Sequence, residues 1–241
     1  MLDAEARERI IVALDCDYDT ALALSDALRG HAKWLKVGMT LYYLAGPQIV
    51  RELKERGFNV FLDLKLHDIP HQVRGAAESA GVAGADLLSV HGSGGAAMLA
   101  ACREGAEAAG EARAERPKLV AITVLTSMDQ AALAEVGVEA PVADQVDRLA
   151  RLAVANGTDG VVCSPQEAAH MRELLGPDAL IVTPGVRPSG SDVGDQSRVA
   201  TPAQAISAGA SHLVIGRPIT GADDPVQAYE AIVDELCSKV H

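Results

Sequence analysis

Residues 59–66 read Asn-Val-Phe-Leu-Asp-Leu-Lys-Leu, a run in which apolar side chains are nearly continuous. Strict alternation of polar and apolar residues indicates a strand with one solvent-exposed face, whereas a continuous apolar run indicates a parallel strand that is buried on both faces. An alanine-rich stretch at residues 71–80 follows and predicts a helix. A strand followed by such a helix is one βα unit, so this region favours a parallel α/β fold.

Similar apolar runs recur along the chain at an even spacing, and each is followed by a helical pattern. They are residues 10–15, 34–39, 86–91, 119–125, 160–164, 179–184 and 212–217. Dividing 241 residues among eight strands gives about 30 residues per unit, the size of one βα repeat. We therefore expect a single (β/α)8 TIM barrel domain over residues 1–241. The alternative, an open doubly wound sheet, does not usually need eight evenly spaced strands.

Helices are expected after every strand. Their ranges are residues 19–29, 46–56, 71–80, 94–109, 142–155, 165–175, 202–208 and 225–239. Asp19 is the expected N-cap of the first helix, and Gly30 is expected to end it. Proline is tolerated in the first turn of a helix, and it stands at such positions at Pro47, Pro165, Pro202 and Pro225.

Three glycines stand between the end of a helix and the start of a strand, namely Gly84, Gly157 and Gly209. This position favours glycine because the chain leaves a helix there in a left-handed conformation. The spacing of the glycines fits the βα repeat if residues 128–140 form an insertion.

The composition is acidic, with 33 Asp and Glu against 21 Lys and Arg and a formal net charge of −12. Nucleic acids and anionic membranes attract basic surfaces, so neither is an expected partner. An anionic ligand must then be bound by a few local cations. The four cysteines show no metal-ligand spacing, and no apolar run approaches the roughly 18 residues of a membrane span. We expect a cytoplasmic protein without a metal site.

The strand at residues 59–66 carries two charges among apolar residues. Asp63 and Lys65 are two residues apart, a spacing that places both side chains on one face of a regular strand. Asp68 follows just beyond the strand. Burying such groups is costly unless they pair, so we expect a reactive acid-base-acid group here. The alternative is a structural ion pair at the end of the strand.

Two more charges interrupt the first two strands. Asp15 ends the first apolar run, and Lys36 lies within the second. Alone, Asp15 could cap a turn and Lys36 could extend its ammonium out of the barrel. Because the strands are neighbours in a barrel, we expect both side chains to join one polar cluster with Asp63 and Lys65.

The last two strands predict an anion site. A glycine- and hydroxyl-rich loop that contains Arg187 follows the seventh strand, and Gly216 and Arg217 end the eighth. Many barrels bind phosphate at this corner, where glycine permits close approach and arginine donates two hydrogen bonds. The loop indicates a lid or an anion-binding segment, although a plain surface loop has the same composition.

The run Asp63-x-Lys65-x-x-Asp68-Ile-Pro, taken with Asp15, Lys36 and Gly216-Arg217-Pro218, resembles the orotidine 5′-phosphate decarboxylase family. The resemblance spans essentially the whole chain. It implies a homodimeric barrel without metal or cofactor that converts orotidine 5′-monophosphate (OMP) to UMP in pyrimidine biosynthesis.

The resemblance also implies roles for individual residues. Lys65 would protonate C6 of the pyrimidine as CO2 departs, and Asp63 would lie beside the substrate carboxylate. Asp68 would reach across the dimer interface into the partner's site. Asp15 and Lys36 would bind the ribose hydroxyls.

The remaining implied contacts complete the substrate site. Thr126, or its neighbour Ser127, would contact the pyrimidine, and Gln196 would bridge base and phosphate. Phosphate binding is implied for Arg187, Gly216 and Arg217, and further substrate contacts for Ile69 and Gln72. Gln72 departs from the family pattern, which has threonine four residues after Asp68; its amide can still donate a hydrogen bond, but that contact is expected to differ.

Two other functions remain open. Sister barrels with the same Asp-x-Lys-x-x-Asp run act on sugar phosphates through Mg2+ and an enediolate. They would need a carboxylate on the second strand, where this chain has Lys36, and an ammonium cannot ligate Mg2+. A silent phosphate-binding barrel would share Gly216 and Arg217 but would not need Lys65 between two acids.

Overall fold

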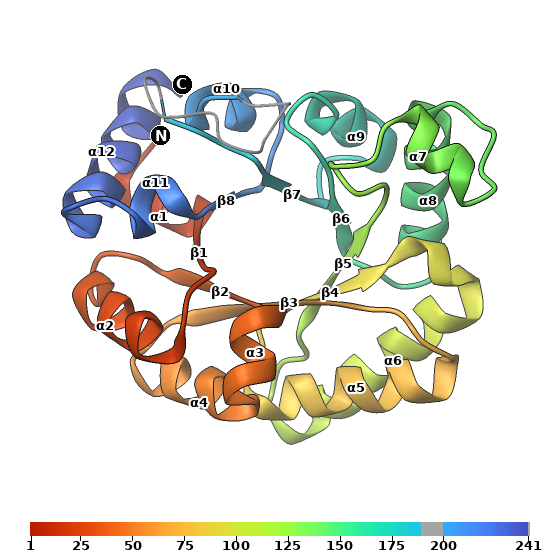
Figure 1. Ribbon diagram of the computed structural model, residues 1–241, viewed down its shortest axis with the longest axis horizontal. Helices are drawn as coiled ribbons and strands as arrows, with labels where there is room; N and C mark the ends of the chain where they lie inside the picture. Colours follow the sequence, from red (N-terminus) through yellow and green to blue (C-terminus); the bar gives the residue numbers. More distant parts are fainter. Residues whose placement is uncertain (189–199, 241) are drawn as a thin grey trace.

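The computed structural model describes residues 1–188 and 200–240, and within them eight parallel strands close into a barrel in chain order (Figure 1). The strands are β1 (Ile10–Leu14), β2 (Trp34–Gly38), β3 (Asn59–Leu66), β4 (Leu87–His91), β5 (Lys118–Ile122), β6 (Gly160–Val162), β7 (Leu180–Pro184) and β8 (His212–Ile215). Because β1 pairs with both β2 and β8, the predicted TIM barrel is confirmed and the open sheet is excluded.

The strand predictions are too long at the C-terminal ends of β5, β6 and β8. The structure ends β5 at Ile122 rather than at residue 125. Val124 and Leu125 are apolar because they line a cavity at the mouth of the barrel, not because they pair in the sheet. Hydrophobic patterning alone does not separate these two environments.

The helices surround the barrel (Figure 1). Those that follow predicted ranges are α2 (Tyr18–Leu28), α4 (Pro47–Glu55), α5 (Pro70–Ala83), α6 (Gly95–Ala112), α8 (Val142–Ala155), α9 (Ala168–Leu175), α10 (Pro202–Ser207) and α12 (Pro225–Lys239). Short helices that the sequence did not predict are α1 (Asp3–Arg9), α3 (Met39–Ala45), α7 (Gln130–Glu135), α11 (Arg217–Thr220) and the 3-10 turn η1 (Gly92–Gly94). The sequence did not predict them because each has too few turns to show the helical periodicity of apolar residues. Within residues 1–188 and 200–240, every helix is too short or too polar to span a bilayer.

Two predicted helix starts are wrong. The N-cap of α2 is Asp17 rather than Asp19, because the Asp17 carboxylate accepts the backbone N–H of Thr20 at 2.9 Å. Pro165 lies before α9, which begins at Ala168.

The predicted insertion at residues 128–140 contains the short helix α7. The predicted left-handed glycines are confirmed, with φ of 119° at Gly84, 101° at Gly157 and 101° at Gly209.

Apolar side chains pack on both faces of the barrel, as the continuous runs predicted. A large cluster lies between strands and helices. A smaller one fills the barrel and consists of Ile11, Ala13, Phe61, Leu87, Val120, Val182 and Val214. Inward-facing residues at the C-terminal ends of the same strands therefore lie directly above this packed barrel interior.

Helices α5 and α6 pack closely because glycine lies between them. A Cβ on Gly105 of α6 would collide with the backbone carbonyl oxygen of Arg74 on α5, and a Cβ on Gly81 of α5 would collide with Ala109 of α6. Helix α5 contacts β3, and α6 contacts β5, so the pair supports the strand that carries Asp63 and Lys65 from outside the barrel.

Gly105→Ala should lower the free energy of unfolding by roughly 1–3 kcal/mol, since the added methyl forces two backbones apart. Gly75→Ala on α5 is the matched control, because its Cβ meets nothing within 4 Å. That change should raise stability by about 0.5–1 kcal/mol by favouring the helix. Urea unfolding checks both, and equal stability of the two variants would contradict the packing argument.

Candidate active site

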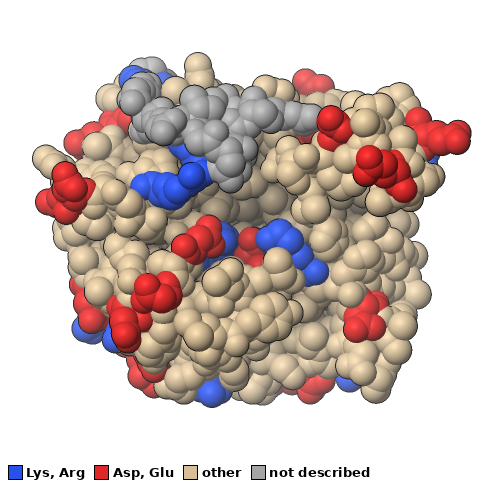
Figure 2. All heavy atoms as spheres, in the orientation of Figure 1, with Lys and Arg blue, Asp and Glu red and all other residues tan. Residues whose placement is uncertain are grey.

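A cavity of about 490 Å³ opens at the C-terminal ends of the strands. In Figure 2 this face is hollowed at its centre, where acidic and basic side chains lie together. The charged residues that line the cavity come from β2 and β3 and from the segments after β1, β7 and β8: Asp15, Lys36, Asp63, Lys65, Arg187 and Arg217. The charges predicted to form one cluster are thus brought together.

The Asp63 carboxylate is the centre of the charged cluster. Its side chain is 13% exposed, and its Oδ2 accepts a hydrogen bond from Lys65 Nζ at 2.8 Å. Lys36 Nζ lies 3.8 Å from the same oxygen. Burial acts to raise the pKa of this carboxyl, but the two ammonium charges and the hydrogen bonds to it outweigh burial and leave the pKa below 3.8. Asp63 is therefore ionised at neutral pH.

Lys36 links the buried carboxylate to the mouth of the barrel. Its Nζ donates to Asp15 Oδ1 at 2.9 Å, and the Lys36 side chain is 9% exposed whereas Asp15 is 65% exposed. Gly38 leaves room for this pair, because a Cβ there would lie 3.1 Å from both Asp15 Oδ1 and Lys36 Nζ. The charges run Asp15, Lys36, Asp63, Lys65, so each carboxylate neighbours an ammonium.

Lys65 does not follow the regular geometry that the two-residue spacing assumed. Leu62 pairs with Leu88 but Leu66 pairs with Val90, so β3 uses four residues where β4 uses two. Within this bulge Lys65 has φ of 52°, a left-handed conformation that is uncommon outside glycine. The two side chains meet because of the bulge rather than by strand alternation. Unusual backbone of this kind gathers at functional sites.

Ser89 of β4 was missed by the sequence analysis. Its Oγ donates to Asp63 Oδ1 at 2.7 Å and accepts the backbone N–H of Lys65 at 2.9 Å. The sequence did contain a signal for Ser89, which is a polar residue inside an apolar strand. It lies two positions from Leu87, which faces the barrel interior, so both side chains are on the same face of β4. Burying a hydroxyl costs much less than burying a charge, so a serine in an apolar strand stands out less than Asp63 or Lys65 does.

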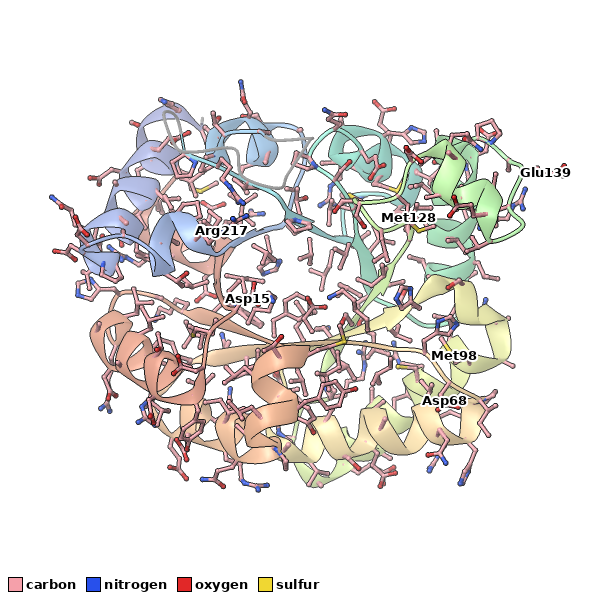
Figure 3. The ribbon with its side chains drawn as sticks, viewed as in Figure 1. Asp15, Asp68, Met98, Met128, Glu139 and Arg217 are labelled. Atoms are coloured by element: carbon pink, nitrogen blue, oxygen red, sulfur yellow. The ribbon has the colours of Figure 1, made fainter. Side chains whose placement is uncertain are left out.

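The predicted phosphate corner holds two arginines and a glycine. Gly216 precedes α11, Arg217 begins it, and Arg187 lies just beyond β7; all three line the cavity. Figure 3 shows Asp15 and Arg217 on the same side of the barrel, as expected for the ends of the paired strands β1 and β8. The arginines supply positive charge that the acidic composition lacks.

An apolar wall completes the cavity and was not predicted. It consists of Ile122, Val124, Leu125, Val162 and Pro184, with the predicted Thr126 beside it. These side chains lie at or just beyond the ends of β5, β6 and β7, where an apolar residue looks like a continuation of the strand. A flat, uncharged ring fits such a wall, whereas the charged groups at the ends of β1, β2 and β3 lie on the other side of the barrel.

Three predicted residues lie outside this cavity. Asp68, Ile69 and Gln72 are exposed, and Asp68 Oδ1 accepts the backbone N–H of Ile69 at 2.6 Å. Figure 3 shows Asp68 far from Asp15 and Arg217. The chain's own cavity therefore holds Asp63 and Lys65 but not the second acid of the expected group. Gln196 lies outside the described residues.

Two imidazoles lie near the bulge. The rings of His67 and His91 stand 5.1 Å apart between centroids. Burial lowers the pKa of His91, and the neighbouring charge of Lys65 lowers it further, so this ring is neutral at neutral pH. Among residues 1–188 and 200–240, no group of His, Cys, Asp and Glu is arranged to hold a metal ion.

Asp63→Asn should lower the free energy of unfolding by roughly 1–3 kcal/mol at neutral pH, because Lys36 and Lys65 lose their shared counter-charge. The folded-state pKa of Asp63 lies below 3.8, so its ionised form contributes stability above that pH, and the contribution is lost as the pH falls through the folded-state pKa. The difference between wild type and variant should therefore shrink below pH 3.8.

Urea unfolding at several pH values measures this difference. Asp234→Asn, a change at an exposed carboxylate on α12, is the control and should show no comparable loss. A variant as stable as wild type at neutral pH would contradict the assignment of Asp63 as the shared counter-charge.

Comparison with known proteins agrees with this geometry. The family model described as orotidine 5′-phosphate decarboxylase / HUMPS matches residues 8–232. The chain is 52% identical over 239 residues to an orotidine 5′-phosphate decarboxylase of Moorella thermoacetica, covering 98% of this chain and 95% of that protein. It is 52% identical over 229 residues to one of Cutibacterium acnes, covering 94% and 95%.

A crystal structure of orotidine 5′-phosphate decarboxylase from Lactobacillus acidophilus matches with a TM-score of 0.86 and 40% identity. The match covers 95% of this chain and 99% of that chain. The sequence match and the shared barrel extend over nearly the whole length. The chain therefore belongs to the orotidine 5′-phosphate decarboxylase / HUMPS family.

Proposed function

We propose that the chain decarboxylates OMP to UMP in pyrimidine biosynthesis, without a metal or organic cofactor. The observation that carries this proposal is the ionised Asp63 carboxylate held between Lys36 and Lys65 at the floor of the cavity. An ammonium fixed against a buried carboxylate is suited to a reaction in which negative charge develops on carbon and is then protonated.

The parts of OMP match the parts of the cavity. Arg187, Gly216 and Arg217 form the phosphate end, and the apolar wall with Thr126 or Ser127 faces the pyrimidine. Asp15 and Lys36 bind the ribose hydroxyls between these ends. A volume of about 490 Å³ is in the range of cavities that hold small ligands. Gln196 is proposed to bridge base and phosphate, as the family resemblance implies.

Lys65 carries the chemical step. The bond between C6 and the carboxylate carbon breaks, its electron pair stays on C6, and CO2 leaves. Lys65 Nζ stabilises the developing charge and gives C6 a proton, after which the amine regains a proton from water. Asp63 lies beside the substrate carboxylate, so their repulsion is relieved as CO2 departs, while Asp63 still attracts the Lys65 ammonium until its proton moves to C6.

Binding of the distant phosphate and ribose supports this step. Enzymes lower barriers by about 8–23 kcal/mol or more, which a single ammonium does not provide. Contacts at Arg187 and Arg217 hold the pyrimidine against Lys65 and help to exclude water from it.

We propose that the active form is a homodimer in which Asp68 enters the partner's cavity. Asp68 does not line the cavity of its own chain, and it adjoins Ile69, an exposed apolar side chain. Met39, Tyr43 and Leu44 of α3 are exposed too, and Tyr43 is 80% exposed. Exposed apolar side chains grouped after consecutive strands are typical of an interface. Ile69 and Gln72 then contact substrate together with Asp68.

Magnesium-dependent sugar-phosphate chemistry is the alternative within this family. Lys36 Nζ lies 2.9 Å from Asp15 and 3.8 Å from Asp63, so an ammonium occupies the position between two carboxylates where a divalent cation would bind. This arrangement favours the metal-free reaction.

The protein treated with EDTA should convert OMP to UMP, followed by the change in ultraviolet absorbance. Lys65→Ala should lower kcat by about 10⁴-fold or more, because both the fixed cation and the proton donor are lost. It should bind UMP within about threefold of wild type, since the phosphate contacts remain.

No turnover of OMP by the wild-type protein would overturn the proposed function. Activity that disappears with EDTA and returns with Mg2+ would favour the alternative. Lys54→Ala, a change at a lysine that pairs with Asp86 outside the cavity, is the control and should keep kcat.

The shared site predicts complementation between inactive subunits. Lys65→Ala and Asp68→Asn homodimers should each be nearly inactive, whereas a mixed dimer contains one site with both wild-type residues. Mixing after subunit exchange should therefore restore up to about one quarter of the wild-type activity per site. Exchange itself is followed by mass spectrometry of tagged subunits, and proven exchange without recovered activity would contradict a shared site.

A further inference from the structure

The hydroxyl of Ser89 lies at the point where the charged cluster meets the bulge of β3. Ser89 is fully buried inside the barrel. Its Oγ contacts Asp63 Oδ1 at 2.7 Å and the backbone nitrogen of Lys65 at 2.9 Å. One small side chain therefore bonds both the carboxylate and the backbone of the lysine that the proposed reaction uses.

The direction of these two hydrogen bonds is determined by chemistry. The ionised Asp63 carboxylate only accepts, so the single hydroxyl hydrogen of Ser89 points to Asp63. The backbone N–H of Lys65 only donates, so it takes a lone pair of the same oxygen. The Ser89 hydroxyl therefore has one fixed orientation. While Asp63 is ionised, the donor and the acceptor cannot exchange roles in either hydrogen bond.

The bond to Lys65 coincides with the unusual backbone. Lys65 has φ of 52°, and the register of β3 against β4 shifts around it. A residue held in the left-handed region persists only where its surroundings stabilise it. The hydrogen bond from the Lys65 N–H to Ser89 Oγ is such a contact, and its acceptor lies on the neighbouring strand β4.

We propose that Ser89 is a positioning residue, which holds the left-handed turn at Lys65 and the rotamer of Asp63 so that the Lys65 ammonium is aimed at the reacting carbon. This assignment rests on the proposed decarboxylation for its catalytic consequence. The hydrogen bonds themselves do not depend on which substrate binds.

Ser89→Ala removes both hydrogen bonds and leaves the Lys65 N–H without its acceptor. We expect kcat for OMP to fall about 10- to 100-fold, because hydrogen bonds to charged groups are among the stronger ones. KM and UMP affinity should change less than about threefold, since Arg187 and Arg217 are untouched. Amide hydrogen exchange at Lys65, measured by NMR, should become at least about tenfold faster.

Ser89→Thr keeps the hydroxyl and should restore most of kcat and the slow exchange. Ser25→Ala is the matched control: Ser25 is also fully buried, but its Oγ donates only to the Leu22 carbonyl on α2 at 2.7 Å. It should leave kcat and exchange at Lys65 unchanged. If Ser89→Ala does not fold, Ser89→Cys keeps the volume with a much weaker hydrogen-bonding group and should show the same losses.

Wild-type kcat together with wild-type exchange at Lys65 in Ser89→Ala would overturn the proposal. Equal losses of kcat and UMP affinity, or losses shared by Ser25→Ala, would overturn it as well, because they indicate general destabilisation. If the wild-type protein does not turn over OMP, the proposed function fails separately, and the exchange measurements still decide whether Ser89 holds Lys65.

Discussion

The site depends on one buried carboxylate that stays ionised. Asp63 sits above the apolar floor of the barrel, an environment that disfavours charge, and two ammonium groups and a serine hydroxyl overcome that cost. Removing a partner would leave a buried charge unsatisfied. The same carboxylate fixes the places of Lys36 and Lys65, so the cluster forms as a unit and the cavity is charged on this side before any ligand binds.

The barrel supplies what this cluster needs. Parallel strands bring Asp15, Lys36 and Asp63 to one end although they are distant in sequence, and Gly38 leaves space for the ion pair. The bulge in β3 turns Lys65 back toward Asp63, and the close α5 and α6 pair supports β3 from outside. The apolar wall and the arginine corner complete the lining of the cavity, so this acidic protein gathers a few cations at one place.

Much of this arrangement follows from the sequence, for identifiable reasons. Continuous apolar runs at even spacing predicted every strand, and charges inside those runs predicted Asp15, Lys36, Asp63 and Lys65. The end of β5 was overestimated because residues lining a cavity are as apolar as residues in a sheet. Ser89 was missed because an uncharged residue in a strand is unremarkable until its partners are known. The bulge at Lys65 depends on pairing with β4, which local sequence does not encode.

The ionisation of Asp63 in the free protein decides whether two ammonium charges outweigh burial in this site. The carboxyl carbon of Asp63 can be followed by NMR as the pH is lowered, with the resonance assigned by its loss in Asp63→Asn. We expect the carboxyl to stay ionised below pH 3.8, the ordinary pKa of aspartate, because two ammonium groups stabilise its charge. Protonation at or above that pH would mean that burial outweighs the charges of Lys36 and Lys65, and that Asp63 is not the shared counter-charge of the site.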